Sequence, residues 1–138
     1  MRRTLALFVL LGACGDDGSA APDADLTADA EAPRQSVAED KLLLVGEIAE
    51  ATLTGGPGDR AIITLTAPEA ALDWNIHGHA NGGSQTVKEE LRVMSATYTF
   101  SPTAQADWSL LVRNQSTQPM TINIKVDLFH DMSWSGWQ

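Results

Sequence analysis

The sequence predicts an all-β chain, an antiparallel β-sandwich of six to eight strands that follows a disordered amino-terminal segment. Three observations lead to this prediction. Apolar and polar residues alternate with a period of two over several short runs, which is the pattern of half-buried strands. Turn-forming residues separate these runs about every ten residues, a spacing typical of sandwiches. Only the chain before the first run is dominated by small and acidic residues, which cannot bury enough apolar surface to fold.

Each element is predicted from its own alternation, and glycine, proline and asparagine clusters mark the turns between them. Residues 42–53 are ambiguous, because Glu47–Ala51 either continues a strand or forms a helical turn; a strand is favoured, since β elements dominate the rest. Val87–Leu91 is a candidate for a short helical turn. The clear strands are Ala61–Thr66, Leu72–His77, Met94–Phe100, Trp108–Arg113 and Met120–Leu128.

Two tryptophans are the largest candidates for the core. Trp74 and Trp108 each lie in phase with aliphatic neighbours, so they are expected on the inner face of their strands. Arg113 has the opposite phase to Trp108 and is expected at the surface.

The amino terminus has the pattern of a secretory signal peptide. Two arginines precede the apolar run Leu5–Leu11, which is too short to span a membrane. Leu11-Gly12-Ala13-Cys14 resembles the lipobox of bacterial lipoproteins. This resemblance implies cleavage after residue 13, a diacylglyceryl group on the sulfur of Cys14 and acylation of the new amino group. The alternative is an ordinary signal peptide with an incidental cysteine.

Residues 14–40 are expected to be the lipidated cysteine and a disordered linker, followed by a domain over residues 41–138. The linker has eight acidic residues and one basic residue, Arg34, and few large apolar side chains. It is interpreted as a spacer between membrane and domain, with an acidic ion- or partner-binding strip as the alternative. Gly15 follows the cysteine where enteric lipoproteins retained at the inner membrane have aspartate, so the family pattern favours the outer membrane.

Charge and cysteine content exclude several classes of function. The formal net charge is −9, which argues against a nucleic-acid partner because phosphates require a basic surface. A single cysteine allows no intramolecular disulfide and no multi-cysteine zinc site.

Residues Asp107–Asn114, a turn and the strand to Leu128 resemble the end of small secreted β-sandwiches, such as the pre-peptidase C-terminal and GOLD-like jelly rolls. This resemblance implies a jelly-roll-like sandwich with a non-catalytic accessory or binding role. No functional residue is carried over from these families.

Two histidines form the one local pattern with metal chemistry. His77 and His79 are two residues apart on a predicted strand, so both side chains are expected on its outer face, opposite Trp74. Zinc or copper suits imidazole, and His130 or Asp131 is the expected source of a third ligand. The alternative is a pair of ordinary surface histidines.

The carboxyl-terminal segment contains two further tryptophans, Trp134 and Trp137. They are expected to pack over an open edge of the sandwich, because two exposed tryptophans would favour aggregation. The alternative is a contact surface for a sugar or a protein partner.

No nucleophile elbow, phosphate loop or zinc-protease motif is found, and the protein is not expected to be an enzyme. Adjacent Glu89 and Glu90 would point to opposite faces of a strand and could not act as an acid–base pair. Three functions remain open. The first is an envelope lipoprotein that binds a protein or polysaccharide without catalysis, the second an envelope zinc- or copper-binding protein, and the third a small hydrolase without a recognisable motif.

Overall fold

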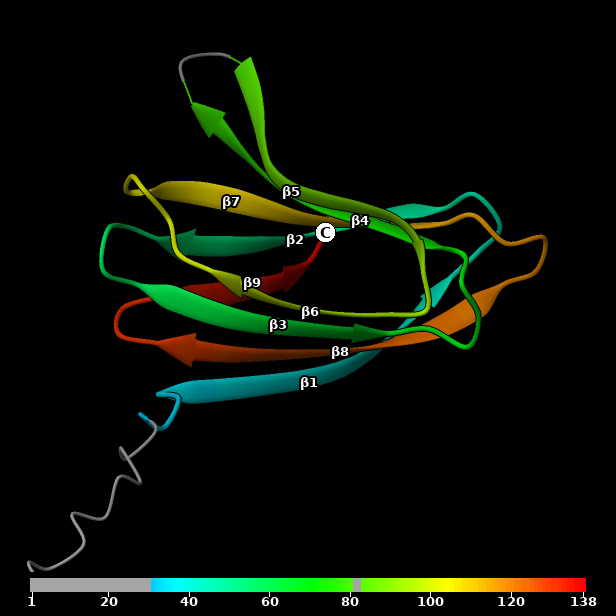
Figure 1. The fold of residues 1–138 in the computed structure, drawn as a ribbon, viewed down its shortest axis with the longest axis horizontal. Helices are drawn as coiled ribbons and strands as arrows, with labels where there is room; N and C mark the ends of the chain where they lie inside the picture. The colour runs from blue at the N-terminus through cyan, green and yellow to red at the C-terminus, as the bar shows by residue number, and fades with distance from the viewer. Residues whose placement is uncertain (1–30, 81–82) are drawn as a thin grey trace, which may run out of the picture. The chain divides into compact units, whose positions relative to one another are not determined.

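The computed structural model describes residues 31–80 and 83–138 and shows an all-β fold of two packed antiparallel sheets (Figure 1). The compact unit that contains all the strands extends over residues 31–138. The strands are β1 (Gln35–Leu43), β2 (Ile48–Gly55), β3 (Arg60–Thr66), β4 (Leu72–Ala80), β5 (Gly83–Val93), β6 (Ser95–Phe100), β7 (Ala106–Asn114), β8 (Met120–Phe129) and β9 (Ser133–Trp137).

The strand order confirms the predicted β-sandwich and its jelly-roll character. One sheet has the order β1-β8-β3-β6 and is called sheet A, and the other has the order β5-β4-β7-β2-β9 and is called sheet B. Apart from the β4–β5 hairpin, every connection between consecutive strands crosses from one sheet to the other. The first eight strands follow the jelly-roll arrangement, and β9 adds an edge strand to sheet B beside β2.

The apolar residues of the period-two pattern fill the space between the two sheets. In β8, every second residue from Met120 to Leu128 is buried, and the residues between them are exposed or only partly buried. In β7, Trp108 is buried and Arg113 is exposed, as predicted. Trp74 is also buried, and the Phe100 and Trp108 rings meet edge to face with centroids 5.3 Å apart.

The expected boundary between linker and domain was wrong. Residues 35–40, assigned to the linker, form the first part of β1 and pair with β8 from Gln35↔Leu128 onward. Ser36 Oγ donates a hydrogen bond of 2.6 Å to Asp127 of β8. The acidic composition concealed this strand, because β1 is an edge strand that carries charged residues in both phases: Asp40 is exposed, and Glu39 and Lys41 are only partly buried.

The predicted number of strands was also too small. Residues 42–53 contain parts of two strands, joined by a turn in which Gly46 has a φ of 73°. The segment Val87–Leu91 is not a helical turn but lies inside β5, and the carboxyl-terminal segment forms β9. Strand β5 has register irregularities in its pairing with β4, so its sequence lacks a simple alternation.

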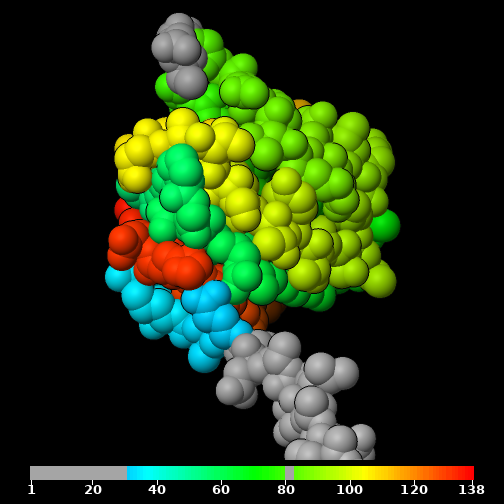
Figure 2. Space-filling model, turned by 60° about the vertical axis from the view of Figure 1, so that its left-hand side comes forward, coloured from blue at the N-terminus to red at the C-terminus, as the bar shows by residue number. Residues whose placement is uncertain are grey.

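Hydrogen bonds fasten the turns at both ends of the sandwich. At one end, buried Asn114 donates from Nδ2 to the carbonyl oxygens of Leu43 and Gln118. At the other end, the Asp59 carboxylate accepts hydrogen bonds from the N–H groups of Gly56 and Asp131, joining the β2–β3 and β8–β9 turns. Figure 2 shows the β8–β9 segment, in orange-red, between the blue start of β1 and the green β2–β3 turn.

The part of the chain described here contains no helix with the length and hydropathy needed to cross a membrane.

Candidate functional site

The outward face of sheet B carries the two histidines of β4 and a hollow lined by charged and aliphatic side chains. Across β4, β7 and β2, the register aligns outward side chains in rows, because alternate residues of each strand face away from the core. One row is Asp73, Arg113 and Ile48, the next is Asn75, Leu111 and Glu50, and the third is His77, Ser109 and Thr52.

The first row, together with Asn75 and Leu111 of the second, borders a hollow of about 220 Å³, which also reaches two outward residues of β5, Glu89 and Leu91. Ile48 is 52% exposed and Leu91 is 62% exposed. The outer face of a sandwich sheet normally carries polar side chains in the solvent-facing phase. Five other large hydrophobic side chains of the described residues are also exposed, and Ile48 and Leu91 differ from them by lining a hollow that charged side chains also line.

Asp73 fixes the shape of one wall of the hollow. Its Oδ1 accepts a hydrogen bond of 2.8 Å from the backbone N–H of Arg92, and its Oδ2 accepts one from Nε2 of Gln115. Arg92 has a φ of 54°, in a stretch where Val93 pairs with Leu72 but Glu90 pairs with Trp74. The carboxylate thus holds a β-bulge in β5, and the bulge places Leu91 beside the hollow.

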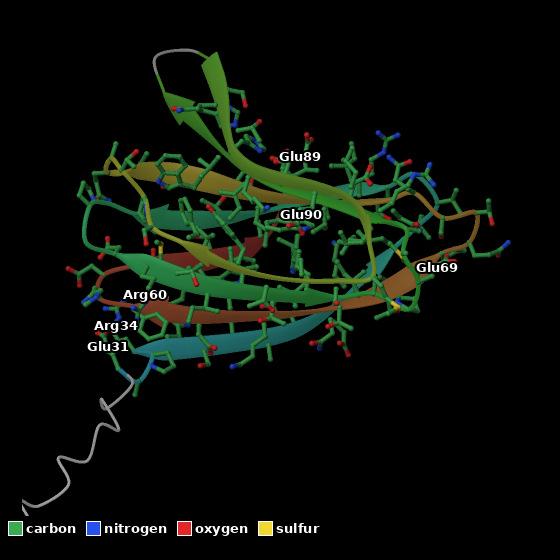
Figure 3. The ribbon with its side chains drawn as sticks, viewed as in Figure 1. Glu31, Arg34, Arg60, Glu69, Glu89 and Glu90 are labelled. Carbon is green, nitrogen blue, oxygen red and sulfur yellow. The ribbon has the colours of Figure 1, made fainter. Side chains whose placement is uncertain are left out.

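Glu89 and Glu90 lie on opposite sides of β5, as the sequence indicated (Figure 3). Glu89 borders the hollow. Glu90 instead accepts a 3.2 Å hydrogen bond from Nε1 of Trp74 and lies 2.9 Å from Nζ of Lys88. The hydrogen bond from Lys88, followed by that from Trp74, lowers the pKa of Glu90 below its ordinary value. Glu90 is therefore a structural partner of Trp74.

The two histidines of β4 come together on the outward face. The ring centroids of His77 and His79 are 5.0 Å apart with an angle of 87° between the planes. His77 is only 7% exposed, whereas His79 is exposed. Nδ1 of His77 lies 2.7 Å from Oδ1 of Asn75.

His130, the expected third ligand, lies in the turn between β8 and β9. Its Nε2 is 3.6 Å from a carboxylate oxygen of Glu31, and Figure 3 shows Glu31 near Arg34 and Arg60 at one end of the molecule. In residues 31–80 and 83–138, no three His, Cys, Asp or Glu side chains come close enough to hold one metal ion. Strands β7 and β2 separate β4 from β9, a spacing of about 14 Å across the sheet.

The carboxyl-terminal tryptophans are packed against the core. Trp134 and Trp137 are half-buried, and their rings meet edge to face with centroids 5.8 Å apart. Nζ of Lys41, from β1 in the other sheet, lies 5.9 Å from the Trp137 ring centroid. This arrangement agrees with packing over the open edge of the sandwich between β1 and β9.

Cys14 and the rest of the lipobox lie outside the described residues. The structure therefore tests only the predictions about the domain, and lipidation stays a prediction from the sequence.

The hollow itself was missed from the sequence. One signal was present: Ile48 and Leu111 are aliphatic residues out of phase with the buried residues of β2 and β7. The contribution of β5 had no such signal, because that segment was interpreted as a possible helical turn.

No protein-family model matches the chain, and the search of curated proteins finds no match. Solved structures with the same fold do match. The chain resembles the Yersinia pseudotuberculosis-derived mitogen with a TM-score of 0.55 and 13% identity, over 72% of this chain and 88% of that one. It also resembles Aeromonas hydrophila PliG, a periplasmic lysozyme inhibitor of g-type lysozyme, with a TM-score of 0.52 and 10% identity, over 67% of this chain and 85% of that one. At these identities the likeness establishes the fold.

Proposed function

We propose that this protein is a lipid-anchored lipoprotein of the bacterial cell envelope whose sandwich is a non-catalytic binding domain. Its binding surface is the hollow on the outward face of sheet B, and its partner is a protein. The observation that carries this proposal is the exposure of Ile48 and Leu91 inside a hollow bordered by charged side chains.

Aliphatic side chains at the centre and charged ones around them are the usual composition of a protein-binding surface. Burying Ile48 and Leu91 against a partner would remove apolar area from water, which favours association. Asp73, Arg113 and Glu89 supply both signs of charge for orienting the partner. A polysaccharide is supported less, because the carboxyl-terminal tryptophans that would stack on sugar rings are half-buried against the core.

The charge of the domain favours a basic partner. Residues 31–138 contain thirteen acidic and seven basic residues, which gives a formal net charge of −6. A partner of opposite charge would be attracted over a distance of about 8–10 Å at physiological ionic strength. PliG has the same fold and is a periplasmic lysozyme inhibitor of g-type lysozyme, which makes a lysozyme a candidate partner to be tested.

In this proposal, lipidation of Cys14 attaches the protein to a membrane of the cell envelope. Two or three acyl chains on Cys14 would hold the protein on a membrane, since one chain alone binds only marginally. Gly15 after the cysteine favours the outer membrane. Mass spectrometry of detergent-extracted protein should identify an acylated peptide that begins at Cys14, and Cys14→Ser should abolish the modification. A mature chain that begins elsewhere without lipid would exclude the anchor.

The binding surface is tested by changing the hollow without changing the fold. The double variant Ile48→Lys/Leu91→Lys places two charges on it. A matched control, Thr97→Lys/Thr121→Lys, places the same charges at exposed positions of sheet A. Quantitative co-purification from envelope extracts should show at least a tenfold loss of the partner for the first variant and no change for the control. Equal recovery with both variants would place the binding surface elsewhere.

A further inference from the structure

We propose that His77 and His79 form a two-imidazole binding site for a divalent transition-metal ion, with Cu²⁺ preferred over Zn²⁺. This site lies beside the protein-binding hollow, with which it shares Asn75, and metal binding does not depend on a partner there. It uses two ligands from the chain and leaves the other coordination positions to water or to another small donor.

The first observation behind this proposal is the distance between the two rings. Imidazole nitrogens bind such ions at about 2.0–2.1 Å, so two rings on neighbouring corners of one ion have centroids about 4.5–5.2 Å apart. The centroids of His77 and His79 are 5.0 Å apart. The pair therefore has a separation compatible with metal binding.

The second observation is the support of His77 by Asn75. Oδ1 of an asparagine can only accept a hydrogen bond, so the tautomer of His77 with its proton on Nδ1 donates across the 2.7 Å contact. Nε2 then keeps its lone pair for a metal ion. A histidine oriented through its other nitrogen is the usual arrangement at metal sites, where the supporting group fixes the tautomer and raises the basicity of the ligand.

The third observation is the position of the pair in the fold. His77 pairs with Ser109 of β7, and Gly78 is the last residue of β4 that pairs with β7. His79 therefore lies where β4 and β5 continue past the rest of sheet B (Figure 1). One ligand is held within the sheet, and the other is exposed to incoming ions.

The donor set determines the expected metal. Neutral imidazole binds zinc, copper and nickel, whereas calcium and magnesium require oxygen ligands. At a site that does not impose its own geometry, the affinity for divalent first-row metal ions rises from Mn²⁺ to Cu²⁺ and is lower again for Zn²⁺. Water and exchangeable donors in the remaining positions impose no such geometry.

The test is titration of the full chain, without an added histidine tag, with CuCl₂ and separately with ZnCl₂. One equivalent of Cu²⁺ should bind at least tenfold more tightly than Zn²⁺. His79→Gln should weaken Cu²⁺ binding at least tenfold, and Asn75→Ala should weaken it by a smaller factor. His130→Gln is the matched control. It should change nothing, because His130, the third histidine of the chain, lies in the β8–β9 turn near Glu31.

Electron paramagnetic resonance of the copper form provides a readout that does not depend on affinity. The spectrum should show coupling to two imidazole nitrogens in the natural protein and to one after His79→Gln. Circular dichroism of each variant would show that it is folded, and His79 is the residue to change first because its side chain is exposed. Undetectable binding at millimolar Cu²⁺, binding unaffected by His79→Gln, or binding lost with His130→Gln would each overturn the proposal.

Discussion

Gly78 lies directly opposite Trp108 in the β4–β7 ladder, and the tryptophan ring covers the place where a side chain would be. A Cβ atom added to Gly78 would lie 2.7 Å from Cζ3 of Trp108. The residue between the two histidines must therefore be small, because the core packs against its backbone. This contact explains a glycine inside a strand, where glycine is otherwise unfavourable.

Gly78→Ala is expected to destabilise the fold by about 1–3 kcal/mol, the usual cost of overpacking a filled core. Gly78 is not among the glycines with a positive φ, so the effect would come from the contact with Trp108 alone. Chemical denaturation would measure it, with His79→Ala as the neighbouring control, expected within about 0.5 kcal/mol. An unchanged unfolding free energy in Gly78→Ala would show that the ring can move aside without cost.

Trp108 and Arg113 provide a test of the strand phase. Trp108→Ala should cost about 3–5 kcal/mol, because it removes a large buried ring. Arg113→Ala should change stability by no more than about 0.5 kcal/mol, since its side chain is exposed on the outward face. The measurement is again the free energy of unfolding, and similar small effects in both variants would contradict the arrangement of β7.

Residues 35–40 are expected to be needed for full stability. A chain that begins at Lys41 lacks most of β1 and leaves much of one edge of β8 unpaired, so its melting temperature should be lower than that of a chain beginning at Glu31. Differential scanning calorimetry of the two chains makes the comparison. Equal melting temperatures would mean that β1 contributes little and that the domain begins near residue 41 after all.

Asp59 is expected to make stability depend on pH in the acid range. Hydrogen bonds from the N–H groups of Gly56 and Asp131 lower the pKa of this carboxyl below its ordinary value of 3.8. A group with a lowered pKa in the folded state stabilises the fold above its unfolded pKa, and this contribution disappears as the pH falls through the folded value. In Asp59→Asn, the loss of stability between neutral pH and pH ~3 should be smaller than in the natural protein. An identical pH profile would show that these hydrogen bonds do not favour the charged form.

The period-two alternation was sufficient to predict the sandwich and the burial of Trp74 and Trp108, because every second residue of those strands must face the same core. It was insufficient for β5, whose bulges break the alternation, and for the acidic start of β1, which packs as an edge strand.

Parts of the candidate site followed from the sequence, and others required the fold. The convergence of His77 and His79 follows from their spacing along one strand. The place of His130 depends on which strands lie between β4 and β9, and local sequence carries no information about that order. The hollow likewise depends on register, because Ile48, Arg113 and Asp73 become neighbours only when three strands align.

The central claim is that the outward face of sheet B receives a protein partner, and site-specific photo-crosslinking in intact cells tests it most directly. A photoreactive amino acid at Leu91 reports on the hollow, and the same amino acid at Thr97, exposed on sheet A, is the control. The account predicts one discrete protein adduct from position 91, no adduct from position 97, and loss of the first adduct when Ile48→Lys is added. No adduct from position 91, or the same adduct from both positions, would contradict it.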